Sequence, residues 1–137
     1  MKSLSVIIII FVILLVVFGA ITMSIYLHPK VDMTFAENGV AIFKYENNDI
    51  SQSISNDDMM AICKLFNGKK MFFDNLSCGF TDNVSILING SEQFCFACDT
   101  CPIVYWKSKN KFFTLSESEY NELIQILSKY GFVFPCV

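Results

Sequence analysis

Arginine is absent from this chain of 137 residues, and histidine occurs only once, at position 28. The lack of guanidinium groups argues against bidentate recognition of phosphate, and no glycine-rich loop is present to cradle one. A single histidine beside an apolar segment supplies no Ser/His/Asp arrangement, and we interpret His28 as an interfacial residue rather than a metal ligand. The sequence therefore offers no catalytic residue and gives enzyme activity little support.

Basic residues are also few beyond Leu27, where nine lysines face thirteen acidic residues, a net charge of −4. These lysines are scattered along the sequence rather than gathered into a stripe. Nucleic-acid binding requires a basic patch that neutralises phosphates, so we expect no nucleic-acid partner.

The sequence does contain one long apolar run, from Ser3 to Leu27, without a charged residue. A helix over positions 4–27 would be about 36 Å long, enough to cross a hydrocarbon layer of about 30 Å. The run exceeds the apolar core of a signal peptide, and Phe18-Gly19-Ala20 fits a cleavage site poorly. No cysteine between Phe11 and Lys30 is available for lipid attachment. Residues 1–28 are therefore predicted to be a retained, single-pass signal-anchor.

The six cysteines all lie beyond this run and indicate the side of the membrane on which the rest of the chain sits. Lys2 and Lys30 nearly balance across the run, so charge favours an inside amino terminus only slightly. Disulfides persist outside the reducing cytosol, and six cysteines in a small domain are readily explained by them. We therefore expect residues 29–137 to form a domain outside the cell, anchored to the cell membrane.

The order of helix and strand patterns in residues 29–137 predicts an α+β fold, with an antiparallel sheet and two amphipathic helices on one face. Ser55 begins one helix that ends near Gly68, and Ser116 with Glu119 forms a capping box for another that Gly131 ends. Asn38-Gly39 and Asn89-Gly90 are strong turn signals. Strands are predicted at 31–35, 40–45, 50–54, 84–88, 93–97, 103–107 and 111–114, with a further candidate at 71–73.

The only group of residues with a chemical pattern is Cys95, Cys98 and Cys101, with Cys78 upstream and Cys136 near the carboxyl end. Cys95, Cys98, Cys101 and Cys136 have the composition of a zinc or iron–sulfur site, although their spacing departs from the usual motifs. Cys98 and Cys101 have C-x-x-C spacing, but no helix follows them to activate a thiolate. Structural disulfides and free core thiols complete the alternatives.

Structural disulfides are the favoured interpretation, and the sequence leaves all fifteen complete pairings of the six cysteines possible. A turn between adjacent strands would bring Cys98 opposite Cys101. Cys136 would tie the tail to the loop that contains Cys78. Cys63, on the buried face of the first domain helix, is interpreted as a core thiol or a partner of Cys95.

Two segments, 97–102 (ACDTCP) and 129–136 (KYGFVFPC), resemble those of uncharacterised small membrane-anchored or exported proteins of low-GC Gram-positive bacteria. The resemblance covers about the last 60 residues. It implies a location at the membrane and no activity.

The sequence thus predicts a membrane-anchored, extracytoplasmic, disulfide-stabilised module that binds an unknown protein or small ligand and needs no cofactor. The alternative is a thiol–disulfide redox or metal–thiolate protein that works through Cys95, Cys98 and Cys101.

Overall fold

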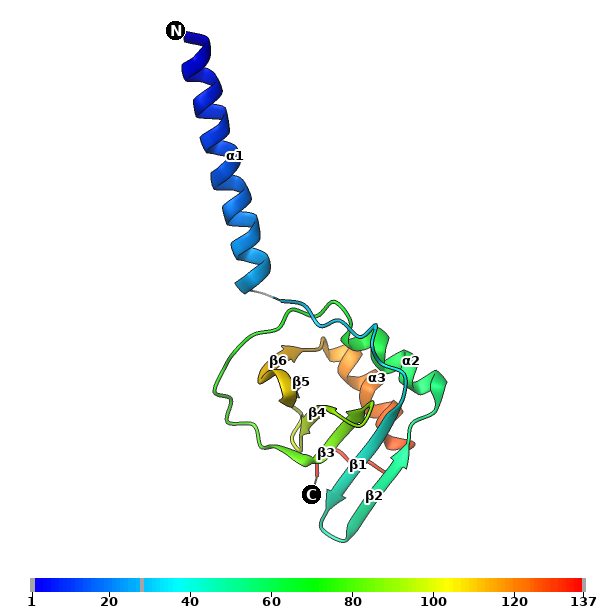
Figure 1. The fold of residues 1–137 in the computed structure, drawn as a ribbon. Coiled ribbons are helices and arrows are strands. Elements are labelled where there is room, and N and C mark those ends of the chain that lie inside the picture. The colour runs from blue at the N-terminus through cyan, green and yellow to red at the C-terminus, as the bar shows by residue number, and fades with distance from the viewer. Residues whose placement is uncertain (1, 28, 137) are drawn as a thin grey trace.

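The computed structural model describes residues 2–27 and 29–136 and shows one long helix standing away from an α+β domain (Figure 1). The helix α1 spans Lys2–Leu27. Within it, Val6–Ser24 is long and apolar enough to cross a membrane, and none of it is buried against the domain. A signal sequence near the amino terminus meets the same criteria of length and composition, so this helix is either a signal sequence or an anchor.

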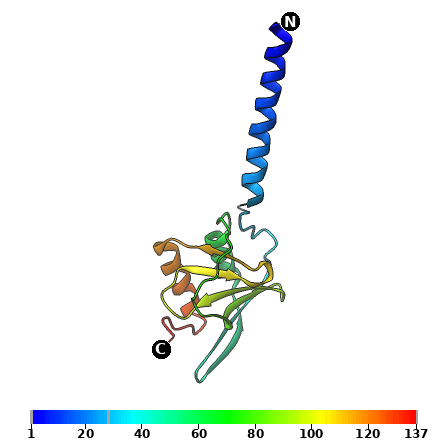
Figure 2. The same cartoon turned by 90° about the vertical axis from the view of Figure 1, so that its left-hand side faces the viewer.

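The domain is built on a six-stranded antiparallel sheet with the order β2-β1-β3-β4-β5-β6. Two further α-helices follow β2 and β6 in the chain and lie on one side of the sheet (Figure 2). The elements are β1 (Gly39–Tyr45), β2 (Asn48–Ser53), α2 (Asn56–Phe66), β3 (Phe80–Ile88), β4 (Glu92–Ala97), β5 (Ile103–Trp106), the short 3-10 helix η1 (Lys107–Lys109), β6 (Lys111–Thr114) and α3 (Glu117–Ser128). The predicted fold class is confirmed.

Local sequence signals account for the ends of the domain helices. The Ser55 side chain accepts a hydrogen bond from the Asp58 amide at the start of α2. Ser116 and Glu119 form the predicted capping box at the start of α3. Each cap satisfies amide groups that the first helical turn leaves unpaired, which fixes where the helix begins.

Two of the predicted strands do not form, although the turn at Asn89-Gly90 does. Both of those residues have positive φ, as a tight hairpin turn requires, and they join β3 to β4. Residues 31–35 do not form a strand. The only bridge nearby in the described residues is an isolated one between Lys30 and Lys70. Residues 71–73 likewise contribute only a bridge between Phe72 and Phe112. Asn38-Gly39 leads into β1 instead of joining two strands.

The main core lies between the sheet and the two helices. Phe66 of α2 packs its ring 5.0 Å from that of Phe113 and 5.4 Å from that of Phe94, measured between centroids. Leu123 and Leu127 of α3 are buried in the same cluster. Members of the main core alternate along β3 (Val84, Ile86, Ile88) and β4 (Phe94, Phe96), so these side chains point to the helices, and the side chains between them point to the opposite face.

Candidate functional site

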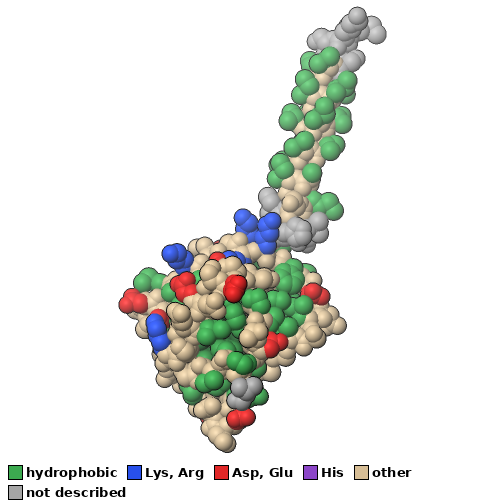
Figure 3. Space-filling model, turned by 180° about the vertical axis from the view of Figure 1, so that it is seen from behind, with side chains coloured by type: hydrophobic (Ala, Val, Ile, Leu, Met, Phe, Trp, Pro, Cys, Tyr) green, Lys and Arg blue, Asp and Glu red, His purple; other side chains and the backbone are tan. Residues whose placement is uncertain are grey.

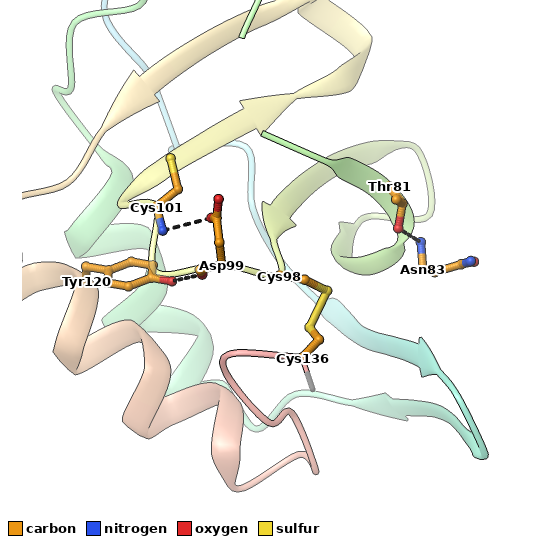
Figure 4. Close-up of a disulfide and its surroundings, with 7 residues drawn as sticks. All are labelled: Thr81, Asn83, Cys98, Asp99, Cys101, Tyr120 and Cys136. Atoms are coloured by element: carbon orange, nitrogen blue, oxygen red, sulfur yellow. Dashed lines mark hydrogen bonds between the residues drawn. A yellow bond between two sulfur atoms is a disulfide. The ribbon is translucent and has the colours of Figure 1, made fainter. Parts of the chain in front are cut away.

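A disulfide joins Cys98, just after β4, to Cys136 in the tail that follows α3 (Figure 4). The two residues are 38 positions apart in sequence, and their Cα atoms are 4.9 Å apart. The Cys136 amide also donates a 2.8 Å hydrogen bond to the Cys98 carbonyl. Cys136 is buried in the main core, and Cys98 packs against it. The bond therefore fastens the tail to the sheet at a position that is already well packed.

A second sulfur pair lies between Cys78, in the crossover from α2 to β3, and Cys101, in the turn before β5. Their Sγ atoms are 3.2 Å apart. The Asp99 carboxylate accepts a 3.0 Å hydrogen bond from the Cys101 amide. One ligand atom from each of Cys78, Asp99 and Cys101 lies within 4.8 Å of the other two. These three residues form what we call the crossover cluster.

The turn that carries the crossover cluster is fixed to α3. The Tyr120 hydroxyl donates a 3.2 Å hydrogen bond to the Asp99 carbonyl (Figure 4). Burial raises the pKa of Tyr120 to about 12, so the hydroxyl keeps its proton and remains a donor at neutral pH. Residues 98–101 are therefore held from one side by the disulfide and from the other by α3.

Three of the thiols, those of Cys63, Cys95 and Cys101, have a raised pKa and are therefore poor nucleophiles. Burial, and then the hydrogen bond with Cys78, raise the pKa of Cys101 to about 11. Burial also raises the pKa of Cys95 to about 11 and raises the pKa of Cys63. A thiol whose pKa is raised by burial stays protonated at pH 7, and the thiolate is the reactive form. The environments of these cysteines therefore favour structural roles, as disulfides or buried thiols, over a role as attacking nucleophiles.

The remaining two cysteines, Cys63 and Cys95, lie on opposite sides of the sheet. Cys95 of β4 is buried on the face turned away from the helices, opposite Tyr105 of β5. Cys63 lies on α2, on the helix side, and is half-buried. Both are free thiols in the structure. The sheet between them prevents the predicted pairing of Cys63 with Cys95.

The arrangement of the other cysteines also differs from the expected one. Cys98 bonds to Cys136 rather than to Cys101, and Cys78 lies beside Cys101 rather than Cys136. Cys98 packs toward the main core, whereas Cys101 lies beside the crossover, so the two side chains of the C-x-x-C sequence have different neighbours. The alternative metal set of Cys95, Cys98, Cys101 and Cys136 is not assembled as four thiols, because two of its members share the disulfide.

A groove lined in part by aromatic side chains lies where the chain leaves α1 and enters the domain, and the sequence analysis did not predict it. Its volume is about 430 Å³, and it is lined by Lys30, Asp32, Thr34, Phe35, Met71, Glu92, Trp106 and Lys109. The rings of Phe35 and Trp106 stack with centroids 6.0 Å apart, and the Lys109 ammonium lies 5.7 Å from the Trp106 ring. The Trp106 indole donates a 2.6 Å hydrogen bond to the Glu92 carboxylate. We call this the aromatic groove.

Lysines that are scattered in the sequence come together near the aromatic groove. Lys30 and Lys70 are bridge partners, and Lys109 lines the groove with Lys30. Figure 3 shows lysine side chains gathered at the end of the domain next to α1. The sequence pattern does not reveal this group of lysines, because the chain segments around positions 30, 70 and 110 meet only in the folded domain.

His28 lies outside the described residues, so its predicted interfacial role stays a prediction. No family model, curated protein or solved structure matches this chain.

Proposed function

We propose that this protein is a single-pass membrane protein whose domain lies outside the cell and acts as a binding module. The bond between Cys98 and Cys136 is the observation that carries the proposal. A structural disulfide persists in an extracytoplasmic space and is rare in a reducing cytosol. The uncharged apolar helix α1 supplies the means of holding the domain at that side of the membrane.

Retention of α1 as an anchor is supported by the length of its apolar segment. Nineteen residues from Val6 to Ser24 rise about 29 Å as a helix, close to the hydrocarbon thickness of about 30 Å. The hydrophobic core of a signal peptide needs only about 7 to 15 residues. All of the large apolar side chains described between Val6 and Ser24 are exposed, so α1 presents an apolar surface around its whole circumference that could contact lipid.

The aromatic groove is the best candidate for a ligand site on the domain. Binding sites are typically concave and mostly apolar, with a few convergent polar groups that orient the ligand. The groove combines the stacked rings of Phe35 and Trp106 with charged groups of both signs at its edges. This composition suits a ligand that has an apolar part and a charged part.

The crossover cluster favours a second candidate function, a thiol–disulfide or metal–thiolate site. Cys78 and Cys101 are close enough to form a disulfide after a small movement, and two thiolates with the Asp99 carboxylate would supply three ligands for a zinc ion. The raised pKa of Cys101 opposes its use as an attacking thiol. A second structural disulfide agrees best with the proposed location of the domain.

The sidedness of the membrane protein is the direct test of the proposal. Protease is added to intact cells that make the full chain, and to the same cells after lysis, and the domain is followed by immunoblot. We expect the domain to be lost from intact cells while α1 stays in the membrane fraction. A domain that is protected in intact cells and degraded after lysis would place it in the cytosol and overturn the proposal.

The second candidate is tested on the same material by its metal content. The full chain is extracted without reductant or chelator, and zinc is measured by mass spectrometry against protein concentration. We expect no stoichiometric zinc, and Cys78→Ser should leave the metal content unchanged. One zinc per chain that is lost in Cys78→Ser would favour the metal–thiolate function instead.

A further inference from the structure

The path of the chain out of α1 brings one end of the domain against the membrane surface, if α1 is the anchor proposed above. Pro29 is only two positions beyond Leu27, a span of about 7 Å at most. The Pro29 carbonyl accepts a 2.8 Å hydrogen bond from the Met71 amide, and the Val31 amide donates to the Lys69 carbonyl at 2.8 Å. The domain is therefore fixed to the chain almost immediately after the helix ends.

The side chains around this attachment point are basic. Lys30 and Lys70 pair across a bridge, Lys109 lines the aromatic groove with Lys30, and Lys111 follows on the edge strand β6. None of these four lysines makes an ion pair among the described residues, whereas Lys44, Lys69, Lys107 and Lys129 do. Their ammonium groups are free to meet an anionic partner.

An exposed aromatic side chain accompanies these lysines. Phe73 is 70% exposed, and its ring lies 4.8 Å from the Lys111 ammonium. It follows Phe72, whose backbone pairs with Phe112 on the edge of β6. Lysines beside an exposed aromatic ring are typical of surfaces that rest at the boundary between headgroups and acyl chains.

The distribution of charge gives the domain a preferred orientation. The four lysines at the attachment point are accompanied by Asp32 and Glu92 of the aromatic groove and by Asp74, which follows Phe73, so this group has a net charge of +1. The remaining five lysines and ten carboxylates of the domain have a net charge of −5. Asp32 and Asp74 accept hydrogen bonds from nearby amides, and Glu92 accepts from Trp106 and Ser108. An anionic surface would attract the first group and repel the rest.

We propose that this membrane-proximal face, comprising Lys30, Lys70, Phe73, Lys109 and Lys111, docks on anionic lipid headgroups of the bilayer that α1 enters. The inference rests on the proposed membrane anchoring and names a binding partner for the same end of the domain. The tether keeps the face at a high local concentration of lipid, so weak contacts suffice to hold it. Docking would bring the aromatic groove to the level of the headgroups.

Trp106 provides a probe, because it is the only tryptophan in the chain and it lines the aromatic groove. The full chain is reconstituted into nanodiscs of phosphatidylcholine, with or without phosphatidylglycerol, that contain a headgroup-spin-labelled lipid. Quenching of Trp106 fluorescence reports its approach to the headgroups. We expect quenching to be at least about twofold stronger in the anionic discs. It should fall at high salt, because the Debye length shortens to about 3 Å at 1 M and the attraction between lysines and headgroups is screened.

Two charge-matched variants make the test specific. The triple variant Lys30→Ser, Lys70→Ser, Lys111→Ser should reduce quenching in anionic discs to the level of the neutral discs. The control Lys44→Ser, Lys64→Ser, Lys129→Ser removes the same charge elsewhere and should leave quenching at least as strong as in the parent. Replacements of such surface side chains rarely disturb folding, and circular dichroism verifies this for each variant.

Each outcome has one meaning. Equal quenching in neutral and anionic discs, or equal loss in the two triple variants, would overturn the docking proposal while leaving the anchor intact. A chain that fails to elute with the discs would overturn the membrane anchoring itself. Phe73→Ser should weaken quenching further than Val133→Ser, an exposed apolar control elsewhere on the domain, and the reverse order would contradict a role for the ring.

Discussion

The two faces of the sheet are held in different ways. On one face, α2 and α3 bury large side chains such as Phe94 and Phe113, both fully enclosed. On the other face, Tyr105 and Phe112 stack with ring centroids 4.8 Å apart, with Phe80 beside them. That second face is adjoined by the crossover from α2 to β3, whose residues 73–75 are exposed.

The difference shows which part of the fold depends on sulfur chemistry. The helix face is held by the burial of large apolar side chains, and the Cys98–Cys136 bond also lies at this face. Beyond the buried Met71, the crossover is irregular and contacts the domain through the Phe72 bridge and the approach of Cys78 to Cys101. An exposed segment of this kind opens at low cost unless a covalent link closes it.

The strongest test of the helix face is Phe113→Ala. The Phe113 side chain is fully buried and its ring contacts those of Phe66 and Phe94, so truncation leaves a cavity between α2 and the sheet. We expect the free energy of unfolding to fall by about 3 to 5 kcal/mol. Urea unfolding of the full chain in detergent micelles, followed by Trp106 fluorescence, measures it. A loss below that caused by Phe80→Ala would reverse the comparison between the faces.

Loss of the disulfide ranks next. The double variant Cys98→Ser, Cys136→Ser opens a loop of 38 positions, for which the chain-entropy account gives about 4 kcal/mol. We expect unfolding in urea to show a loss of about 2 to 4 kcal/mol. Reductant should destabilise the parent more than the double variant, in which only the pair Cys78 and Cys101 could still respond. A parent that is insensitive to reductant would show that the bond does not stabilise the domain.

The effect of Phe80→Ala should be smaller and more local. Phe80 is half-buried at the start of β3, and its ring lies 5.5 Å from that of Phe112 between centroids. We expect a loss of about 1 to 2 kcal/mol together with faster proteolysis of the crossover. Limited proteolysis with mass mapping checks this. Cleavage spread over the helices at the same rate would mean that the crossover does not open separately.

Glu119 gives the smallest effect and a defined pH window. Hydrogen bonds from the Lys69 ammonium, and then from the Ser116 amide, lower the pKa of Glu119 from 4.5 to about 2. Because the folded-state pKa is depressed, this stabilisation is present above about pH 4.5 and is lost as the pH falls toward about 2. Glu119→Gln should cost about 1 kcal/mol at pH 7 and flatten the dependence in that window.

The control for this prediction is Glu122→Gln, which changes the same charge on the exposed side of α3. Its unfolding free energy should follow that of the parent between pH 2 and 7, apart from small surface effects of about 0.5 kcal/mol or less. Equal flattening in the two variants would show that the capping box and the Lys69 contact contribute nothing specific.

Local sequence signals predicted most of the fold because their physical causes are local. The cap at Ser55, the capping box at Ser116 and the turn at Asn89-Gly90 each act over three or four residues. Residues 31–35 misled the prediction because apolar alternation indicates a half-buried segment whether or not a partner strand exists. Here Lys30 bridges Lys70 and the Val31 backbone bonds to Gly68 and Lys69, which belong to the connection after α2 and not to a strand of the sheet.

The candidate sites were much less predictable. Cys98 and Cys101 are close in sequence, yet which sulfur each one meets depends on the direction of its side chain and on segments about 23 and 38 positions away. The aromatic groove joins Phe35 to Trp106, which have no local relation in the sequence. Such contacts follow from sheet order and the path of the crossover, which sequence patterns do not specify.

The state of the cysteines in the full chain tests the account most directly. The chain is extracted from membranes in the presence of an alkylating reagent without reductant, unfolded, and weighed by mass spectrometry before and after reduction. In the structure Cys98–Cys136 is bonded, whereas Cys78 and Cys101 are free thiols 3.2 Å apart. If the domain lies in an oxidising space as proposed, this pair should close too, so the account predicts two alkylated thiols before reduction, Cys63 and Cys95. All six cysteines alkylated before reduction would show a reduced domain and contradict the account.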